Sequence, residues 1–301
     1  MNVSKTPAGE IRNEKPQEKK KKSGPFRQTM KRLFKNKGAV AGLIVITVII
    51  LLSALAPFIA PYGYADINIS NMFSTPSSQH WFGTDHMGRD IFSRILYGGR
   101  ASLQIGFLSS FIATIGAMII GSIAGFFGGR TDNIMMRVLD VIQAMPGVLL
   151  SVTISAVLGT GLYETIIALS IGNLATSARI MRGSVLTIRK AEYIDAAMAD
   201  STGNFDIIRK HILPNAFSPM IVQATMGCAR AILVAATLSF IGLGVQPPNP
   251  EWGAMLSAGR NYIRDYPHII TVPGIAIMLT VLALNLLGDG LRDALDPKLK
   301  R

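Results

Sequence analysis

Three long stretches of the sequence, residues 38–65, 101–129 and 141–163, contain no charged side chain. A helix needs about 20 apolar residues to cross the hydrocarbon core of a bilayer, and an isolated charge in that core is costly. Two further stretches, 212–250 and 266–288, hold one charge and none. In a soluble chain of 301 residues the core helices would instead carry a polar stripe. The pattern predicts an all-α polytopic membrane protein.

A further span is expected at Leu162–Ile180. This segment reaches the required length if Glu164 and Arg179 lie at the two membrane interfaces and extend their charged ends into water. We therefore expect about six transmembrane helices.

The basic residues alternate in number between successive loops. The chain has 30 Lys and Arg against 18 Asp and Glu, a formal net charge of +12. Of the basic residues, 24 lie in segments 1–37, 130–137, 179–210 and 292–301, whereas the alternate loops hold five. Because such residues concentrate on the cytoplasmic side, both termini are expected there. This accounts for the charge without a nucleic-acid partner, although the run Lys19–Lys22 alone would fit a membrane-anchored nucleic-acid binder.

The spans divide the chain into five regions. We expect a cytoplasmic basic tail with an amphipathic interfacial helix from about residue 25, a first span, an extracytoplasmic loop, a permease-like core of five spans and a cytoplasmic C-terminal tail. Their bounds are 1–37, 38–61, 62–100, 101–289 and 290–301. Within the core, residues 182–215 form the large cytoplasmic loop and residues 245–266 the extracytoplasmic one.

The groups needed for catalysis are missing from the sequence. It contains no Gly-Lys-Ser or Gly-Lys-Thr, and hence no P-loop for a nucleotide phosphate. The single cysteine, Cys228, excludes a disulfide framework. A metal site at His80, His86 and Asp85 is conceivable, but exposed loop histidines are the simpler interpretation. We expect a non-catalytic chain with no cofactor and no metal.

Arg230 is the one charge inside a span. A charge at this depth should face a cavity or a partner and not lipid. It could be neutralised by backbone carbonyls or by an acid of a neighbouring subunit, or it could attract an anionic group in a transport pathway. The residues alone leave these interpretations open.

The large inner loop has two helical stretches separated by a break. Helical periodicity runs through Ile194, Ala197 and Met198, stops around 201–203, and resumes at 205–212. Such a compact projection is either a connecting hairpin or a docking element for a soluble partner.

Two outer loops have the composition of an ordered platform. Residues 83–90 are polar and punctuated by glycine, and residues 246–253 are stiffened by prolines. Trp252 is expected to anchor the second loop at the membrane interface.

The inner loop resembles the cytoplasmic "EAA" motif of ABC importer permeases. In that motif Glu-Ala-Ala is followed by a glycine and later by Leu-Pro. Here Asp195-Ala196-Ala197 stand for the triplet, Ser201 occupies the glycine position, and Leu213-Pro214 close the motif. Gly203 is expected to supply the flexible turn that Ser201 lacks. The resemblance implies an ATPase-coupling loop formed by Glu192, Tyr193, Asp195, Ala196, Ala197, Ser201, Gly203, Leu213 and Pro214.

Four further motifs, in order along the chain, are similar to the oligopeptide/dipeptide/nickel permease family, and most to its second, C-type subunit. They are residues 83–90, 238–244, 250–253 and 288–297. The family implies a type I ABC importer permease fold with a cytoplasmic coupling helix. It also implies that an outer cap or binding-protein docking site includes Gly83, Asp85, Gly88, Arg89, Asp90, Glu251 and Trp252. Family members often have an acid where this chain has Ala235 and a small residue at Arg230.

The resemblance also implies partners and a substrate class. A homologous permease would form a heterodimer with this chain in the bacterial inner membrane, two ABC ATPase subunits would bind the inner loops, and an extracytoplasmic binding protein would deliver a di- or oligopeptide. Nickel or another small solute is the alternative cargo. A secondary transporter or channel is the alternative from another class, but it would place coupling carboxylates near the bilayer midplane, where the chain has none.

Overall fold

The computed structural model describes residues 25–295. The described residues are helical, without a strand apart from an isolated bridge between Thr84 and Asp90. The helices are α1 (Pro25–Leu33), α2 (Lys37–Ala54), α3 (Ala56–Ile59), η1 (Ile69–Asn71), α4 (Ile91–Phe127), α5 (Gly129–Gln143), α6 (Gly147–Leu158), α7 (Leu162–Ile188), α8 (Glu192–Ala199), α9 (Asn204–Ile207), η2 (Ile208–Ile212, a π-helix), α10 (Leu213–Phe240), α11 (Trp252–Gly259), η3 (Arg260–Tyr262) and α12 (His268–Leu295).

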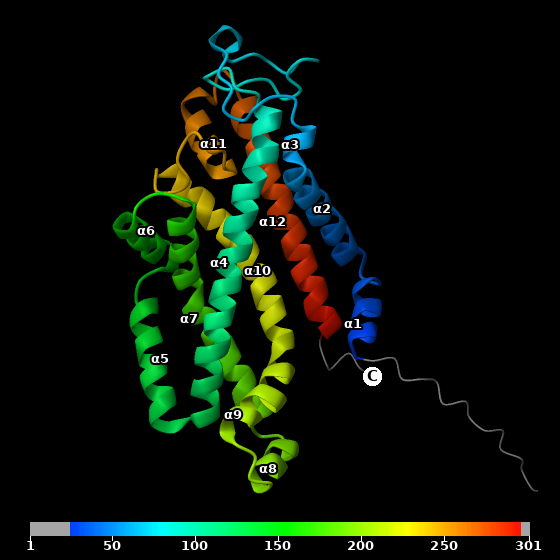
Figure 1. The fold of residues 1–301 in the computed structure, drawn as a ribbon, viewed down its shortest axis with the longest axis vertical. Coiled ribbons are helices and arrows are strands. Elements are labelled where there is room, and N and C mark those ends of the chain that lie inside the picture. Colours follow the sequence, from blue (N-terminus) through cyan, green and yellow to red (C-terminus); the bar gives the residue numbers. More distant parts are fainter. Residues whose placement is uncertain (1–24, 296–301) are drawn as a thin grey trace, which may run out of the picture.

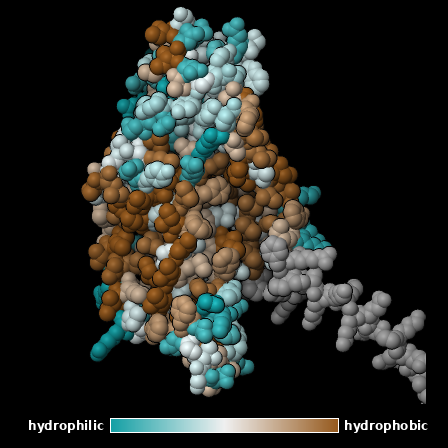
Figure 2. Space-filling model, viewed as in Figure 1, coloured by the Kyte–Doolittle hydropathy of each residue, from teal (hydrophilic) through white to brown (hydrophobic). Residues whose placement is uncertain are grey.

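The long helices form an upright bundle with different structures at its two ends (Figure 1). At one end lies the outer cap, which we define as residues 60–90 together with 241–267. At the other end lies the projection, residues 189–212, which contains α8 and α9. A hydrophobic belt covers the visible face between these two hydrophilic ends (Figure 2). We refer to the two ends of the bundle as the cap end and the loop end.

Small residues allow the central helix α4 to pack closely along its whole length. Gly106 lies directly against Cys228 and Ile232 of α10, and Gly121 lies against the Ala178 carbonyl and the Met181 side chain of α7. Close approach at small residues is the usual basis of helix association in membranes, where helices gain no hydrophobic free energy by leaving lipid. The 37-residue α4 therefore joins α7 and α10 into one body.

The number of straight apolar spans is smaller than expected. Four helices are long and apolar enough to cross a membrane, namely α2, α4, the continuous stretch Asn204–Phe240 and α12. The count becomes five if the bent pair α5 and α6 is one span. α7 forms a 27-residue helix beside α4, which is long enough to span but is less apolar than those four helices. Among the described residues, length and apolarity thus identify four or five of the roughly six expected spans.

The third expected span is broken where the sequence contains Pro146. α5 ends at Gln143, α6 begins at Gly147, and their axes differ by 81°. A proline lacks the N–H that continues a helix and restricts the residue before it, which explains the break. The absence of charge in 141–163 thus did not imply one straight helix.

Two expected boundaries also shift. α4 begins at Ile91, so the outer loop expected at 62–100 ends in helix, and α12 continues to Leu295 into the expected C-terminal tail 290–301. α1 forms where the interfacial helix was expected. Its Leu33 is buried against Ala39 and Ala294, so part of its apolar face packs on the bundle. The remainder of the expected basic tail, residues 1–24, lies outside the described residues.

Candidate functional sites at the two ends of the bundle

The projection at the loop end has a fully buried base. Ile194 of α8, Ile207 of α9 and Ile212 of η2 are each completely buried, and they pack in one cluster with Met181 and Val185 of α7. The acids Glu192 and Asp195 lie in the first turn of α8, where their negative charges interact favourably with the positive end of the helix dipole. The projection is therefore fixed to α7 and α10 and is not a loose connection.

The turn after α8 explains why a serine occupies the expected glycine position. Ser201 has a left-handed backbone with φ of 57°. Its N–H donates to the Met198 carbonyl, and the Thr202 N–H donates to the Ala197 carbonyl, each at 3.2 Å. This hydrogen-bond pair defines a Schellman motif, in which the left-handed residue is usually glycine. The expectation that Gly203 supplies the turn is wrong, because Gly203 has an ordinary φ of −60° at the start of α9.

One side of the projection remains free. Tyr193, Ala196 and Met198 of α8 are exposed, and so is Phe205, at 73%. Ala197 differs from its neighbour because it is half-buried and packs against the cluster at the base. Within the Asp195-Ala196-Ala197 triplet, Ala196 is therefore the small residue available to a partner.

Leu213-Pro214 begins α10 directly after the π-helical turn. The Leu213 N–H donates to the Ile208 carbonyl five residues back, and Pro214 has no N–H to continue the regular pattern. Leu213 is half-buried against the base cluster, and Pro214 is exposed.

At the cap end, Asp85 organises the glycine-punctuated loop. Its carboxylate accepts hydrogen bonds from the Met87 and Arg89 N–H groups at 2.8 and 3.0 Å and from Arg89 Nε at 2.7 Å. Arg94 Nε lies 3.6 Å from the same carboxylate. Gly88 permits this turn because it has a positive φ of 72° and its Cα lies against the Asn68 carbonyl.

Asp90 joins the loop to the start of α4. Its side chain accepts a hydrogen bond from the Ser93 N–H at 2.7 Å and so caps the helix. Its other oxygen lies 2.9 Å from His80 Nδ1. Gly83, with φ of 76°, lies against the Ser74 carbonyl and the His268 ring, which ties this loop to the beginning of α12.

Glu251 connects three helices at the base of the cap. The carboxylate is 1% exposed and accepts hydrogen bonds from Ser102 of α4 at 3.0 Å and Ser239 of α10 at 2.7 Å. It also accepts from the Gly253 and Ala254 N–H groups, each at 2.8 Å, and so caps α11. The buried charge is thus fully hydrogen-bonded, as burial requires.

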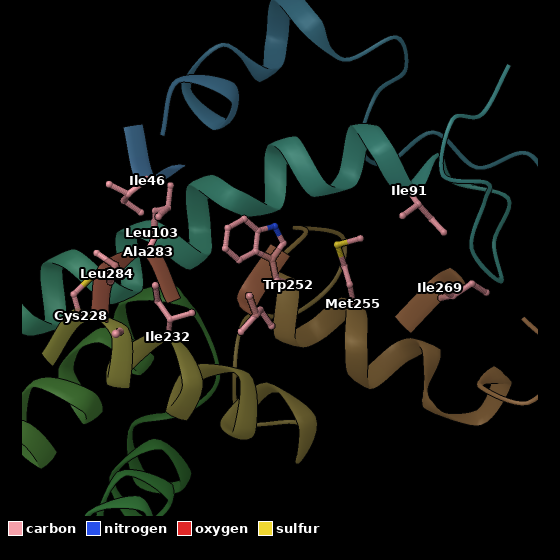
Figure 3. Packing of buried hydrophobic residues seen from close by; sticks show 12 residues of the cluster. Ile46, Ile91, Leu103, Cys228, Ile232, Trp252, Met255, Ile269, Ala283 and Leu284 are labelled. Atoms are coloured by element: carbon pink, nitrogen blue, oxygen red, sulfur yellow. The ribbon is translucent and has the colours of Figure 1, made fainter. Parts of the chain in front are cut away.

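Trp252 is not at the membrane interface, contrary to the sequence-based expectation. It is 2% exposed and lies in the core cluster with Leu103 and Ile232, with its Nε1–H donating to the Ile95 carbonyl at 3.0 Å (Figure 3). Gly98 and Gly99 of α4 lie against the indole, which explains how so large a side chain fits beside that helix.

The sequence-based prediction assigned one set of residues both to the cap and to a docking surface, and their burial distinguishes these two roles. Asp85, Arg89, Asp90, Glu251 and Trp252 are all buried, so within this chain they build the cap and offer no surface to a partner. The large apolar side chains exposed on the cap come from other positions, namely Tyr62, Ile67, Ile69, Met72, Trp81, Phe82, Met87, Ile241 and Ile263.

A small cavity of about 10 Å³ lies among Asp85, His86, Arg89 and Arg94. His86 Nδ1 is buried there without a hydrogen-bond partner, and its ring is stacked on Tyr262. Burial lowers the pKa of His86, with Asp85 opposing this shift and Arg89 and Arg94 adding to it. Among the described residues no group of three His, Cys, Asp or Glu side chains could hold a metal ion.

Several residues of these sites were not found from the sequence. Ser102 and Ser239 give no distinctive pattern, and they lie 149 and 12 residues from the Glu251 that they bind. Asp132 and Arg182, which form a bidentate pair at 2.5 Å between α5 and α7, are separated by 50 residues. The sequence alone offers no means of recognising such distant pairs.

The bundle, its fixed projection and its ordered cap define the class of protein, a multi-pass membrane permease. A family model described as "Binding-protein-dependent transport system inner membrane component" matches residues 117–301, and "N-terminal TM domain of oligopeptide transport permease C" matches residues 24–76. The chain belongs to this family as a permease subunit of a bacterial inner-membrane ABC importer of the oligopeptide/dipeptide type.

Curated relatives match the chain over nearly its whole length. A dipeptide transport system permease protein, DppC, of Alkalihalophilus pseudofirmus is 49% identical over 92% of this chain and 91% of that protein. A di/tripeptide transport system permease of Pseudomonas aeruginosa is 42% identical over 92% and 93%. A glutathione transport system permease of Pectobacterium atrosepticum is 42% identical over 92% of both chains.

The fold resembles that of a solved type I importer. A chain from the MetNI methionine ABC transporter in an inward-facing conformation superposes with a TM-score of 0.56 at 18% identity. The match covers 67% of this chain and 96% of that one.

Proposed function

We propose that this chain pairs with a homologous permease to form the pathway by which a bacterial ABC importer takes up di- or oligopeptides. The observation that carries the proposal is the projection, with its buried isoleucine base and its free α8 face. The printed functions of the relatives, which are dipeptide, di/tripeptide and glutathione transport, support a peptide as the cargo. Nickel or another small solute is the alternative.

ATP hydrolysis belongs to separate subunits in this proposal. Two ABC ATPases bind the projections of the two permeases, each contacting Tyr193, Ala196, Met198 and Phe205 on the exposed side. ATP-driven closure of the ATPases then moves the projection, and α7 and α10, to which its base is fixed, carry the motion into the bundle. The absence of a P-loop from the sequence supports this assignment of the nucleotide to the other subunits.

The loop end faces the cytoplasm in this arrangement. The concentration of Lys and Arg in the segments at that end supports the orientation, which places both termini inside. The cap then faces outward, and an extracytoplasmic binding protein docks on its exposed apolar side chains, among them Ile67, Ile69 and Trp81.

Uptake by the complete complex in proteoliposomes tests the proposal. We expect labelled dipeptide to accumulate only with internal ATP and the binding protein, and uptake to persist when a protonophore collapses the proton gradient. Uptake that needs the gradient and not ATP would identify a secondary transporter. ATP-dependent uptake of nickel that excess peptide does not inhibit would favour the alternative cargo.

A further inference from the structure

Arg230 lies deep within the apolar part of the bundle. It is ten residues before the cap end of α10 at Phe240, or about 15 Å along the helix axis. This is half of the roughly 30 Å hydrocarbon core. The neighbouring residues Cys228 and Ile232 pack against Gly106, six residues further into the bundle than Arg100.

Arg100 of α4 directly precedes the uncharged stretch 101–129. Its guanidinium donates to the Ser53 and Ala54 carbonyls at the end of α2, at 2.8 and 2.7 Å. At 1.5 Å per residue, Gly106 and therefore the level of Arg230 lie about 9 Å deeper. An arginine at that depth is not an interfacial residue.

Among the described residues, the face of α10 that carries Arg230 is exposed. Its exposed positions are Arg230, Leu233, Thr237 and Phe240, three or four residues apart and therefore on one side of the helix. The opposite side, which includes Ala231 and Ala235, is buried against α4 and α7. The face is thus free from Arg230 to Thr237, whereas at the cap end the Arg260 guanidinium lies over the Phe240 ring.

The Arg230 guanidinium is uncompensated. Within residues 29–295 it has no hydrogen bond and no ion pair. Snorkelling to the nearer cap end is disfavoured, because a helical side chain leaves the backbone tilted toward the helix N-terminus, and for α10 that is the loop end. A face with such a charge should not contact lipid.

We propose that Arg230 lines the pathway and binds the carboxylate of the transported peptide as it passes mid-depth. The inference rests on the proposed function and specifies its substrate class, namely peptides with a free C-terminal carboxylate. A guanidinium is suited to this ligand because its planar donors match the two carboxylate oxygens. Thr237, two helical turns toward the cap, adds a hydroxyl to the same side of α10, and this hydroxyl donates to the Leu233 carbonyl at 3.0 Å.

Paired peptides test the inference. Uptake of tritiated Ala-Ala and of its C-terminal amide is measured with the complete complex in proteoliposomes, each at a concentration that saturates the binding protein. Compared with the wild type, Arg230→Gln should reduce the maximal uptake rate of Ala-Ala at least tenfold and change that of the amide less than twofold. Arg230→Lys should give an intermediate loss, since it retains the charge but not the two-pronged donor.

Leu233→Gln is the matched control. It places an amide on the same exposed face without removing a charge, and it should change the uptake of both peptides by the same factor. The amount of partner permease that co-purifies with each variant is measured in parallel. We expect it to stay at the wild-type level for Arg230→Gln.

Three outcomes would overturn the inference. Equal loss of uptake for both peptides, with less co-purified partner, would mean that Arg230 pairs with an acid of the partner permease. Unchanged uptake of both would show that the charge has no role in transport. If the wild type imports another solute with ATP but neither peptide, the peptide proposal itself fails, and the carboxylate inference fails with it.

Discussion

At the scale of single residues, the cap depends on buried charges with complete sets of partners. Glu251 accepts four hydrogen bonds from three helices, and Asp85 accepts three from its own loop. Removing one hydrogen-bond partner of such a buried group destabilises the fold by more than the net free energy of that hydrogen bond. The reason is that the remaining group stays buried with an unsatisfied donor or acceptor. His86 is the exception, since its Nδ1 is buried without a partner.

His86 should make the cap sensitive to acid. Because burial lowers its pKa in the folded protein, protonation favours the unfolded cap. Stability is complete above the ordinary histidine pKa of about 6.5 and is lost as the pH falls toward the lowered folded value. The protection factors of cap amides, which correct the exchange rates for the intrinsic pH dependence of exchange, should therefore fall as the pH is lowered from about 7.5 to about 5.5.

The variant His86→Phe, which keeps a ring to stack on Tyr262, should reduce this pH dependence. The comparison is made between variant and wild type, so that the contributions of all other groups to the pH dependence cancel. An unchanged pH profile in the variant would contradict the assignment to His86.

At the scale of elements, one side of α8 packs against the base cluster and the other side is exposed. Ile194 points into the base cluster, whereas Ala196 is exposed. The Schellman turn at Ser201 fixes where α8 ends, and the π-helical turn at 208–212 determines how α10 begins. α8 therefore presents its exposed residues at a position that is fixed relative to the bundle.

Ala196→Glu should abolish coupling without affecting the fold of the bundle. A long acidic side chain on the exposed face would prevent the close approach that alanine allows, and we expect ATP-dependent uptake to fall at least tenfold. Ala196→Ser, which stays small, is the control and should transport within twofold of the wild type. Normal amounts of both variants in the membrane, measured by immunoblot, would exclude a folding defect; full uptake by Ala196→Glu would refute the docking assignment.

At the scale of the whole molecule, the bundle is assembled through small residues on α4. Gly106, Gly121 and Gly125 each lie where an added Cβ would contact a neighbouring helix within 3.0 Å. The same holds for Gly42 of α2, which lies against the Ala283 carbonyl of α12. The packing of the bundle thus tolerates little change in volume at these positions.

Two glycine-to-alanine substitutions should change the stability of the bundle in opposite directions. Gly121→Ala introduces a methyl group 2.6 Å from the Ala178 carbonyl, and overpacking of this kind costs about 1–3 kcal/mol. Gly183→Ala, in α7, meets nothing within 4 Å and should gain about 0.5–1 kcal/mol from helix propensity. Thermal unfolding in detergent measures both; a stabilised Gly121→Ala would show that α4 and α7 do not pack as described.

The apolar spans, the alternation of basic residues and the ordered motifs are properties of contiguous segments, and the sequence alone was sufficient to identify them. They led to an all-helical membrane permease of the right family, and the projection was found where the motif indicated. Local composition determines whether a segment prefers lipid or water, so such features need no knowledge of the tertiary contacts.

The remaining features of the fold and of the candidate sites were established only by the tertiary structure. It showed the 81° bend at Pro146, the burial of Trp252, the turn at Ser201, the four donors around Glu251 and the lack of any partner for Arg230 within the described residues. The burial of Trp252, the donors around Glu251 and the exposure of Arg230, unlike the local turns, depend on which distant segment lies opposite a given side chain, as Ser102 lies opposite Glu251. In an all-apolar span the sequence carries little periodicity to show which face is packed, so the contacts themselves determine which residues are structural and which are free to bind.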